Sequence, residues 1–112
     1  MPDRATGARR ARHETPQIDE AALAAARHVD RLLAAATTAG LTRWVDFLAP
    51  LPDRLRDDDL KDLRASALRV RAAYGANDSI RDALSAEVTE PALESVDRLL
   101  RLLAREANRG PA

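Results

Sequence analysis

The chain has 112 residues, the size of one small domain, and its 24 alanines and 16 leucines against one Trp, one Tyr and one Phe favour an all-helical fold over a β fold. It contains no cysteine, which excludes disulfides, thiolate metal ligands and a cysteine nucleophile. The absence of cysteine suits a reducing compartment, so we expect a cytoplasmic protein. The formal net charge is zero, and no apolar run approaches the ~20 residues that span a bilayer, so no membrane segment is expected.

The start of the chain is rich in arginine and has no apolar periodicity. Residues 1–13 hold four arginines against one aspartate, a balance of +3, and the remainder therefore balances to −3. A segment that has no large aliphatic residue after Met1 cannot offset the entropy lost on ordering. We predict a flexible basic tail over 1–14 and a single helical domain over 15–109.

Three long helices are predicted from apolar residues that recur at alternating spacings of three and four. The first covers about 16–38, between a Thr-Pro start signal and a glycine, and its predicted buried seam is Ile18, Ala22, Ala25, Val29, Leu32 and Ala36. The next begins at the three aspartates of 57–59 and ends at Gly75, and its predicted seam is Leu60, Leu63, Ala67, Val70 and Tyr74. The last covers about 89–108, and its apolar arc spans roughly 200° of the helix circumference, about twice what one contact face requires. We therefore expect this helix to lie at the centre of the bundle or to share its surface with another subunit.

Two short helices complete the prediction. One holds Trp44 and Phe47 and stops at a proline-rich bend over 49–52, because proline lacks an N–H group and excludes helix from the residue before it. Beyond the bend, Leu55 is expected to point inward. The other short helix follows the Asn-Asp pair at 77–78. The sequence thus predicts a compact, mainly antiparallel bundle of three long and two short helices.

Few side chains are spaced for chemistry. His28 has no second ligand or catalytic partner along its helix, so it is interpreted as a boundary histidine. The aspartates of 57–59 are oxygen donors, but they lack the glycine and distal glutamate of a calcium loop, and helix capping is the favoured interpretation. No phosphate-binding loop, dinucleotide fingerprint or serine nucleophile motif is present. The sequence predicts no catalytic residue, no cofactor and no metal site.

Two alternatives remain open. The run ARRAR at 8–12 provides positive charge for nucleic-acid phosphates, although it has no interleaved aromatic residues and the rest of the chain is acidic on balance. Nucleic-acid binding is therefore disfavoured. A small enzyme whose site is assembled from scattered acids, arginines and His28 is the other alternative.

The apolar residues that remain favour protein–protein interaction. A short helix with two aromatic residues either plugs the end of the bundle or anchors a partner, and contiguous apolar surface is commonly covered by a second copy. We predict a homo-oligomer, preferably a dimer, together with a larger protein partner. The predicted partner or oligomer contacts are Trp44, Phe47, Leu68, Leu99 and Leu102.

Two stretches carry a resemblance to known proteins. They are 35–51, AATTAGLTRWVDFLAPL, and 79–106, SIRDALSAEVTEPALESVDRLLRLLARE, which together make up under half of the chain. They resemble parts of a bacterial family of small helical proteins of unknown function, often encoded beside formate-dehydrogenase-like oxidoreductases. The resemblance implies a non-catalytic accessory or scaffold subunit of an oxidoreductase complex, and it carries over no catalytic residue.

Overall fold

Every regular element that the structure describes is helical. The computed structural model describes residues 12–109. In chain order, with η for a 3-10 helix, the elements are η1 (Arg12–Glu14), α1 (Pro16–Thr38), α2 (Thr42–Leu48), α3 (Leu51–Asp57), α4 (Leu60–Arg71), η2 (Ala72–Tyr74), η3 (Ile80–Asp82) and α5 (Ala86–Arg109). The predicted all-α, mainly antiparallel bundle is confirmed. None of the described helices combines the length and the apolarity needed to cross a membrane.

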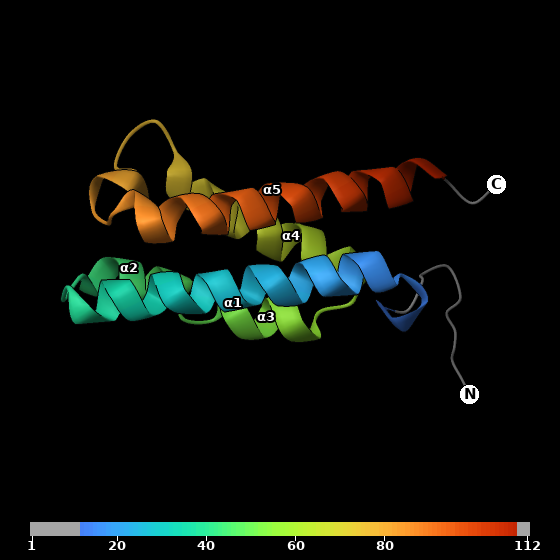
Figure 1. Ribbon diagram of the computed structural model, residues 1–112, viewed down its shortest axis with the longest axis horizontal. Coiled ribbons are helices and arrows are strands. Elements are labelled where there is room, and N and C mark those ends of the chain that lie inside the picture. The colour runs from blue at the N-terminus through green and yellow to red at the C-terminus, as the bar shows by residue number, and fades with distance from the viewer. Residues whose placement is uncertain (1–11, 110–112) are drawn as a thin grey trace.

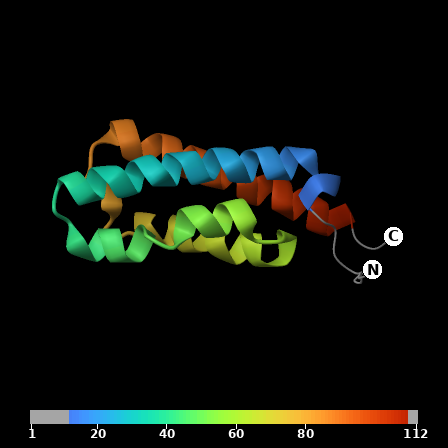
Figure 2. The ribbon, with the colours of Figure 1, turned by 90° about the horizontal axis from the view of Figure 1, so that it is seen from below.

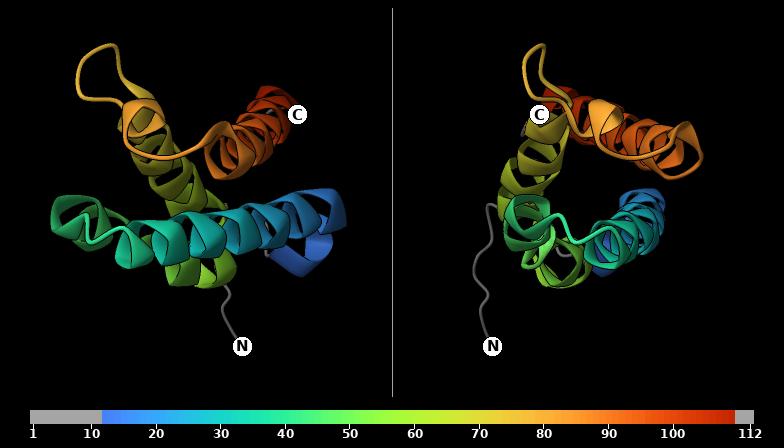
Figure 3. Two further views of the ribbon diagram at one scale, coloured as in Figure 1. Left: turned by 60° about the vertical axis from the view of Figure 1, so that its left-hand side comes forward. Right: turned by 90° about the vertical axis from the view of Figure 1, so that its left-hand side faces the viewer.

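The two long helices, α1 and α5, form the frame of the bundle. They lie side by side and run in opposite directions (Figure 1). The shorter helices close the other sides, with α2 and α3 against α1 (Figure 2). Seen along the bundle, α4 extends from the side of α3 to that of α5 (Figure 3). The principal extents are 46 × 25 × 20 Å, so the two ends of the bundle are well separated.

Small side chains allow the helices to approach closely in the core. Alanines on the inner face of α1 are at most 1% exposed, so the backbones of α3 and α5 can pack near the α1 axis. Leucines and valines of α4 and α5 fill the remaining space. The predicted seam of α1 is confirmed, because all its members are buried: Ile18, Ala22, Ala25, Val29, Leu32 and Ala36.

The segment after Pro50 is helical, which corrects the expected bend over 49–52. Only Ala49 and Pro50 turn, and α3 begins at Leu51. Pro52 is compatible with this helix because it lies in the first turn, where a missing N–H removes no intrahelical hydrogen bond. Leu55 is fully buried, as expected. The bundle therefore has two long helices, one of 12 residues and two of seven, in place of three long and two short.

Two other helix boundaries differ from the prediction. α5 begins at Ala86, a turn earlier than expected, and contains Pro91. Because Pro91 lies near the start of the helix, its missing N–H removes a single intrahelical hydrogen bond. The short helix expected after 77–78 is only the 3-10 turn η3, where the Arg81 N–H donates to the capping Ser79 hydroxyl oxygen.

The boundary of the predicted tail also needs correction. Residues 1–11 lie outside the described residues, but 12–14 form η1 and pack against α1. The prediction considered only apolar periodicity, which this segment lacks. What holds it is the polar side chain of Arg12, whose contacts are described below.

Candidate functional site

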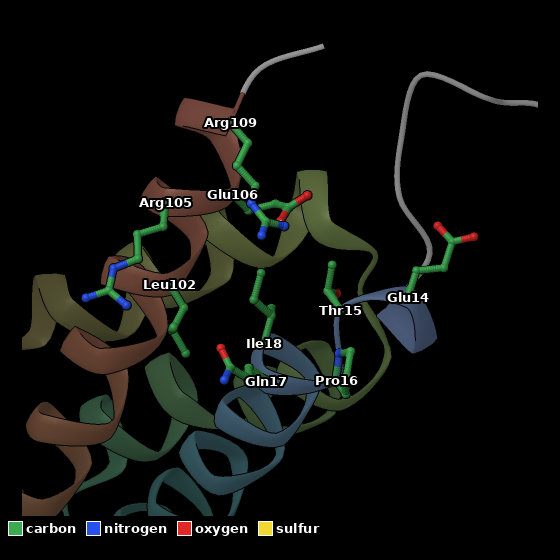
Figure 4. A pocket seen from close by; sticks show the side chains of 9 residues that line it. All are labelled: Glu14, Thr15, Pro16, Gln17, Ile18, Leu102, Arg105, Glu106 and Arg109. Atoms are coloured by element: carbon green, nitrogen blue, oxygen red, sulfur yellow. The ribbon is translucent and has the colours of Figure 1, made fainter. Parts of the chain in front are cut away.

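A groove of about 520 Å³ lies between the start of α1 and the end of α5 (Figure 4). The antiparallel packing of these helices brings residues from the two ends of the chain together there. The lining residues of the groove are Glu14, Thr15, Pro16, Gln17, Ile18, Leu102, Arg105, Glu106 and Arg109.

The middle of the groove is apolar. Ile18 of α1 is only 4% exposed, and Leu102 of α5 is half-buried beside it (Figure 4). Thr15 is buried but does not cap α1; its hydroxyl donates to the carbonyl oxygen of Arg12 at 3.2 Å. Because Ile18 is nearly covered, the apolar surface that the groove offers to a ligand comes mainly from Leu102.

The rim of the groove is charged, and only part of that charge is neutralised. Arg109 pairs with Glu106 at 3.4 Å, and Glu14 and Glu106 each have interaction partners. Arg105 is exposed and makes no ion pair or hydrogen bond with any other described residue. A free guanidinium beside apolar surface is suited to bind a carboxylate through two parallel hydrogen bonds.

A nearly buried arginine holds the same end of the bundle together. The Nη1 group of Arg12 donates to the carbonyl oxygens of Leu55, Arg56 and Asp58 at 2.9, 2.7 and 3.0 Å. Its Nε donates to Asp19 Oδ1 at 2.9 Å, and its side chain is only 11% exposed. The guanidinium thus satisfies the free carbonyls at the end of α3, where a positive charge also complements the helix dipole.

A shallower groove of about 450 Å³ lies beside this arginine. Charged side chains dominate its lining, and Leu23 supplies its main apolar surface, with 36% of the residue exposed. The two grooves share Pro16, so both belong to the end of the bundle where α1 begins.

The opposite end is closed by a buried tyrosine. Tyr74 donates its hydroxyl hydrogen to the backbone oxygen of Thr89 at 2.6 Å. Burial, followed by the nearby carboxylate of Glu90, raises the pKa of Tyr74 above its ordinary value. Arg81 lies over the tyrosine ring and forms two hydrogen bonds with Glu90, at 2.8 and 3.0 Å. Hydrogen bonds from Arg81 and Thr89 hold the pKa of Glu90 below its ordinary value.

The two aromatic residues of α2 lie at this end as well. The rings of Trp44 and Phe47 meet edge to face at 5.8 Å between centroids. Arg43 lies over the Trp44 ring and Arg69 over the Phe47 ring, at 4.7 and 4.6 Å. Trp44 is only 8% exposed, so it mainly plugs the end of the bundle, while Phe47 is half-buried.

The five predicted contact residues do not form one surface: Trp44 and Phe47 contact each other on α2, whereas Leu68 lies on α4 and Leu99 and Leu102 lie on α5. Leu99 is fully buried, which corrects its assignment to an outer surface. The broad apolar arc of α5 is explained by two neighbours in the same chain, α1 and α4, and Leu99 lies at its centre. Leu102 lines the groove, and Leu68 is 42% exposed on α4. Sequence reasoning missed Leu23, Arg12 and the grooves, since apolar periodicity carries no signal for a surface shared by distant residues.

Neither His28 nor the acidic cluster forms a metal site in the described residues. Across 12–109, no group of three His, Asp or Glu side chains is arranged to hold a metal ion. His28 is half-buried, and burial, followed by the nearby Arg31 and Arg27, lowers its pKa, with Glu94 opposing. Asp59 caps α4 by accepting from the Asp62 N–H at 3.1 Å, which confirms the capping interpretation of 57–59.

No protein-family model, curated protein or solved structure matches this chain. The resemblance of 35–51 and 79–106 to small helical proteins encoded beside oxidoreductases therefore stays a prediction. The surface geometry is what remains to support a function, and its most specific feature is the groove that combines Ile18, Leu102 and the free Arg105.

Proposed function

We propose that the protein is a non-catalytic binding module that docks an acidic segment of a larger protein into the groove between α1 and α5. One observation carries the proposal: Arg105, with no partner among the described residues, stands at the rim of a groove in which the half-buried Leu102 supplies apolar surface beside the nearly covered Ile18. A peptide fits this chemistry if it presents one apolar side chain and a carboxylate close to it.

The charge of the surrounding helix supports an acidic partner. The second half of α5, residues 98–109, contains four arginines and one glutamate, a balance of +3. The glutamate, Glu106, is paired with Arg109. The arginines that remain would attract a negatively charged segment and speed its encounter with the groove. The groove volume accommodates a few side chains, so the docked segment is short.

The identity of the larger partner is the finer part of the proposal. The resemblance described above supports an oxidoreductase, for which this protein would act as an accessory or scaffold subunit. A partner helix or tail rich in aspartate and glutamate would satisfy the chemistry of the groove. Self-association is a separate question.

The proposal is tested with a synthetic peptide that has a central leucine flanked by aspartates and glutamates. Titrated into the isotopically labelled full chain, it should shift the amide resonances of Gln17, Ile18 and Leu102 in ¹⁵N–¹H spectra. Replacing the acidic residues of the peptide by lysines is the matched control and should abolish the shifts. Arg105→Glu should weaken binding at least about tenfold, because it removes the guanidinium and adds a like charge. The absence of shifts at millimolar peptide, or shifts centred on Leu68, would overturn the proposal.

A further inference from the structure

The outer face of α5 carries a regular pattern of charge. Residues 87, 91, 94, 98, 101 and 105 follow one another at spacings of 4, 3, 4, 3 and 4, so they form one stripe along the helix. All are exposed except the half-buried Pro91. The stripe begins with Glu87 and Glu94 and continues with Arg98, Arg101 and Arg105. One half of the stripe is thus acidic and the other half basic.

Within the described residues the charged side chains of this stripe form no ion pair or hydrogen bond, although Glu94 is near enough to His28 of α1 to act on its pKa. The other acidic residues of this half of α5 are already paired, Glu90 with Arg81 and Asp97 with Arg71, at 2.8 Å in both cases. The helix dipole acts only within the first and last turns, so it does not account for Glu94 and Arg98 in the middle of the helix. Their i,i+4 spacing permits an intrahelical pair, yet none is formed.

An antiparallel copy of α5 would match this stripe to itself. If a two-fold axis crosses the helix at the level of Val96, Glu94 faces Arg98 of the second copy, and Glu87 faces Arg105 of the second copy. Because of the two-fold symmetry, each of these ion pairs forms twice in the dimer. A parallel arrangement would place glutamate against glutamate and arginine against arginine, which is repulsive. The charge order of the stripe therefore selects the antiparallel arrangement.

We propose that two copies of this chain associate through the outer faces of α5, antiparallel about a two-fold axis near Val96, with Glu87 and Glu94 of each copy paired with Arg105 and Arg98 of the other. The proposal does not rest on the peptide-binding groove, because three of its four charged residues, Glu87, Glu94 and Arg98, do not line that groove. The contact is made mainly of exposed ion pairs, so it is weak and sensitive to salt. The second copy and an acidic peptide would compete for Arg105, the residue that the stripe shares with the groove rim.

Sedimentation equilibrium of the full chain tests the association. At about 100 µM protein we expect dimers in about 20 mM salt, and the dissociation constant should rise at least about tenfold in about 0.5 M salt. A strict monomer at low salt would overturn the proposal, as would a dimer that salt does not weaken. Circular dichroism of every variant checks that the fold is retained.

Charge reversal then tests the pairing itself. The double variants Arg98→Glu with Arg105→Glu, and Glu87→Arg with Glu94→Arg, should each be monomeric alone, because every pair becomes repulsive. Mixed in equal amounts they should form a one-to-one heterodimer, since all four pairs become attractive again. Arg27→Glu with Arg31→Glu on the exposed face of α1 is the matched control and should leave the dimer intact. Double variants that remain dimers, or a mixture that remains monomeric, would refute the pairing. The shifts of the Gln17 and Ile18 amide resonances on addition of the acidic peptide report on the groove independently of dimerisation.

Discussion

The two ends of the bundle are closed by different chemistry. At the end where α1 begins, a guanidinium from η1 reaches across 43 to 46 residues of sequence and binds three backbone oxygens of α3 and its following turn. At the other end, a tyrosine hydroxyl binds one backbone oxygen of α5, and Trp44 and Phe47 cover the remaining surface. The first closure depends on a charged residue outside the long helices, and the second on residues that also belong to the core.

This difference shows how the two ends of a small bundle can differ in local stability. The guanidinium of Arg12 is nearly buried, and one of its nitrogens, Nη2, has no hydrogen-bond partner. Its position therefore depends on the bonds that its other two nitrogens make. Tyr74 has a single polar atom to satisfy and a large ring to bury. We expect the end held by Arg12 to open first, and the following predictions test that expectation.

The largest effect is expected from Val70→Asp, which alters the core that both ends share. Val70 is fully buried in α4, and a buried unpaired carboxylate costs about 4 kcal/mol or more in the free energy of unfolding. Thermal and urea unfolding should show both ends lost together. The comparison variant Val70→Ala removes only methyl groups and should cost about half as much. A Val70→Asp protein that melts like the parent would show that α4 does not join the two ends.

Arg12→Met is expected to have the next largest effect and to act on one end only. It removes the hydrogen bonds to three carbonyls, and we expect the free energy of unfolding to fall by about 2 kcal/mol. Hydrogen exchange should accelerate at the start of α4 and in α3, and much less around Tyr74. Arg27→Met changes an exposed arginine of the adjacent groove and should cost no more than about 0.5 kcal/mol. If the two substitutions lowered the free energy of unfolding equally, Arg12 would contribute no more to stability than an exposed arginine does.

Tyr74→Phe is expected to have a smaller effect at the opposite end. It deletes one buried hydrogen bond while keeping the ring, so we expect a loss of about 1 kcal/mol. The pKa of Tyr74 is raised on folding, so the stabilisation is complete below the unfolded pKa of about 10 and is lost as the pH rises above it. Chemical denaturation across this range should show a steeper alkaline loss of stability in the parent than in Tyr74→Phe. An identical pH dependence in both proteins would contradict this role of the hydroxyl.

The smallest effect concerns His28, which is half-buried on α1. Its pKa is lowered on folding, first by burial and then by Arg31 and Arg27, so the unfolded chain binds the proton more readily. Stability should therefore be constant above the unfolded pKa of about 6.5 and should fall as the pH drops below it. Urea unfolding between about pH 7.5 and 5 should show a shallower decline in His28→Gln. If the parent protein became more stable as the pH falls over this range, the pKa of His28 would not be lowered on folding.

The sequence was sufficient to predict the elements whose signal is periodic. The seam of α1 from Ile18 to Ala36 is buried as expected, because a spacing of three and four places those residues on one helix face. The seam predicted from Leu60 to Tyr74 is buried as well, except for Leu60, which is half-buried at the start of α4. α3 was missed because two prolines outweighed its leucines in the prediction. A proline in the first turn of a helix removes no intrahelical hydrogen bond. The buried Leu55 and the ion pair between Arg56 and Asp30 hold this short helix against α1.

The candidate site could be predicted only in part. Leu102 was expected at an interface and does line the groove, while Leu99, one turn earlier, was expected there and is buried. A helical wheel measures the width of an apolar arc, but it does not tell whether one neighbour or two will cover that arc. The packing of both α1 and α4 on α5 settled which leucines remained accessible.

By itself the sequence determined that this protein is helical, where its long helices lie and which of their faces are apolar, because these properties depend on residues at most a few positions apart. Only the tertiary structure decided that Arg12 closes one end of the bundle, that Tyr74 closes the other, and that Ile18 and Leu102 form one groove. Those contacts join residues separated by 15 to 84 positions. Their geometry follows from how whole helices pack, and no local pattern of residue types encodes it.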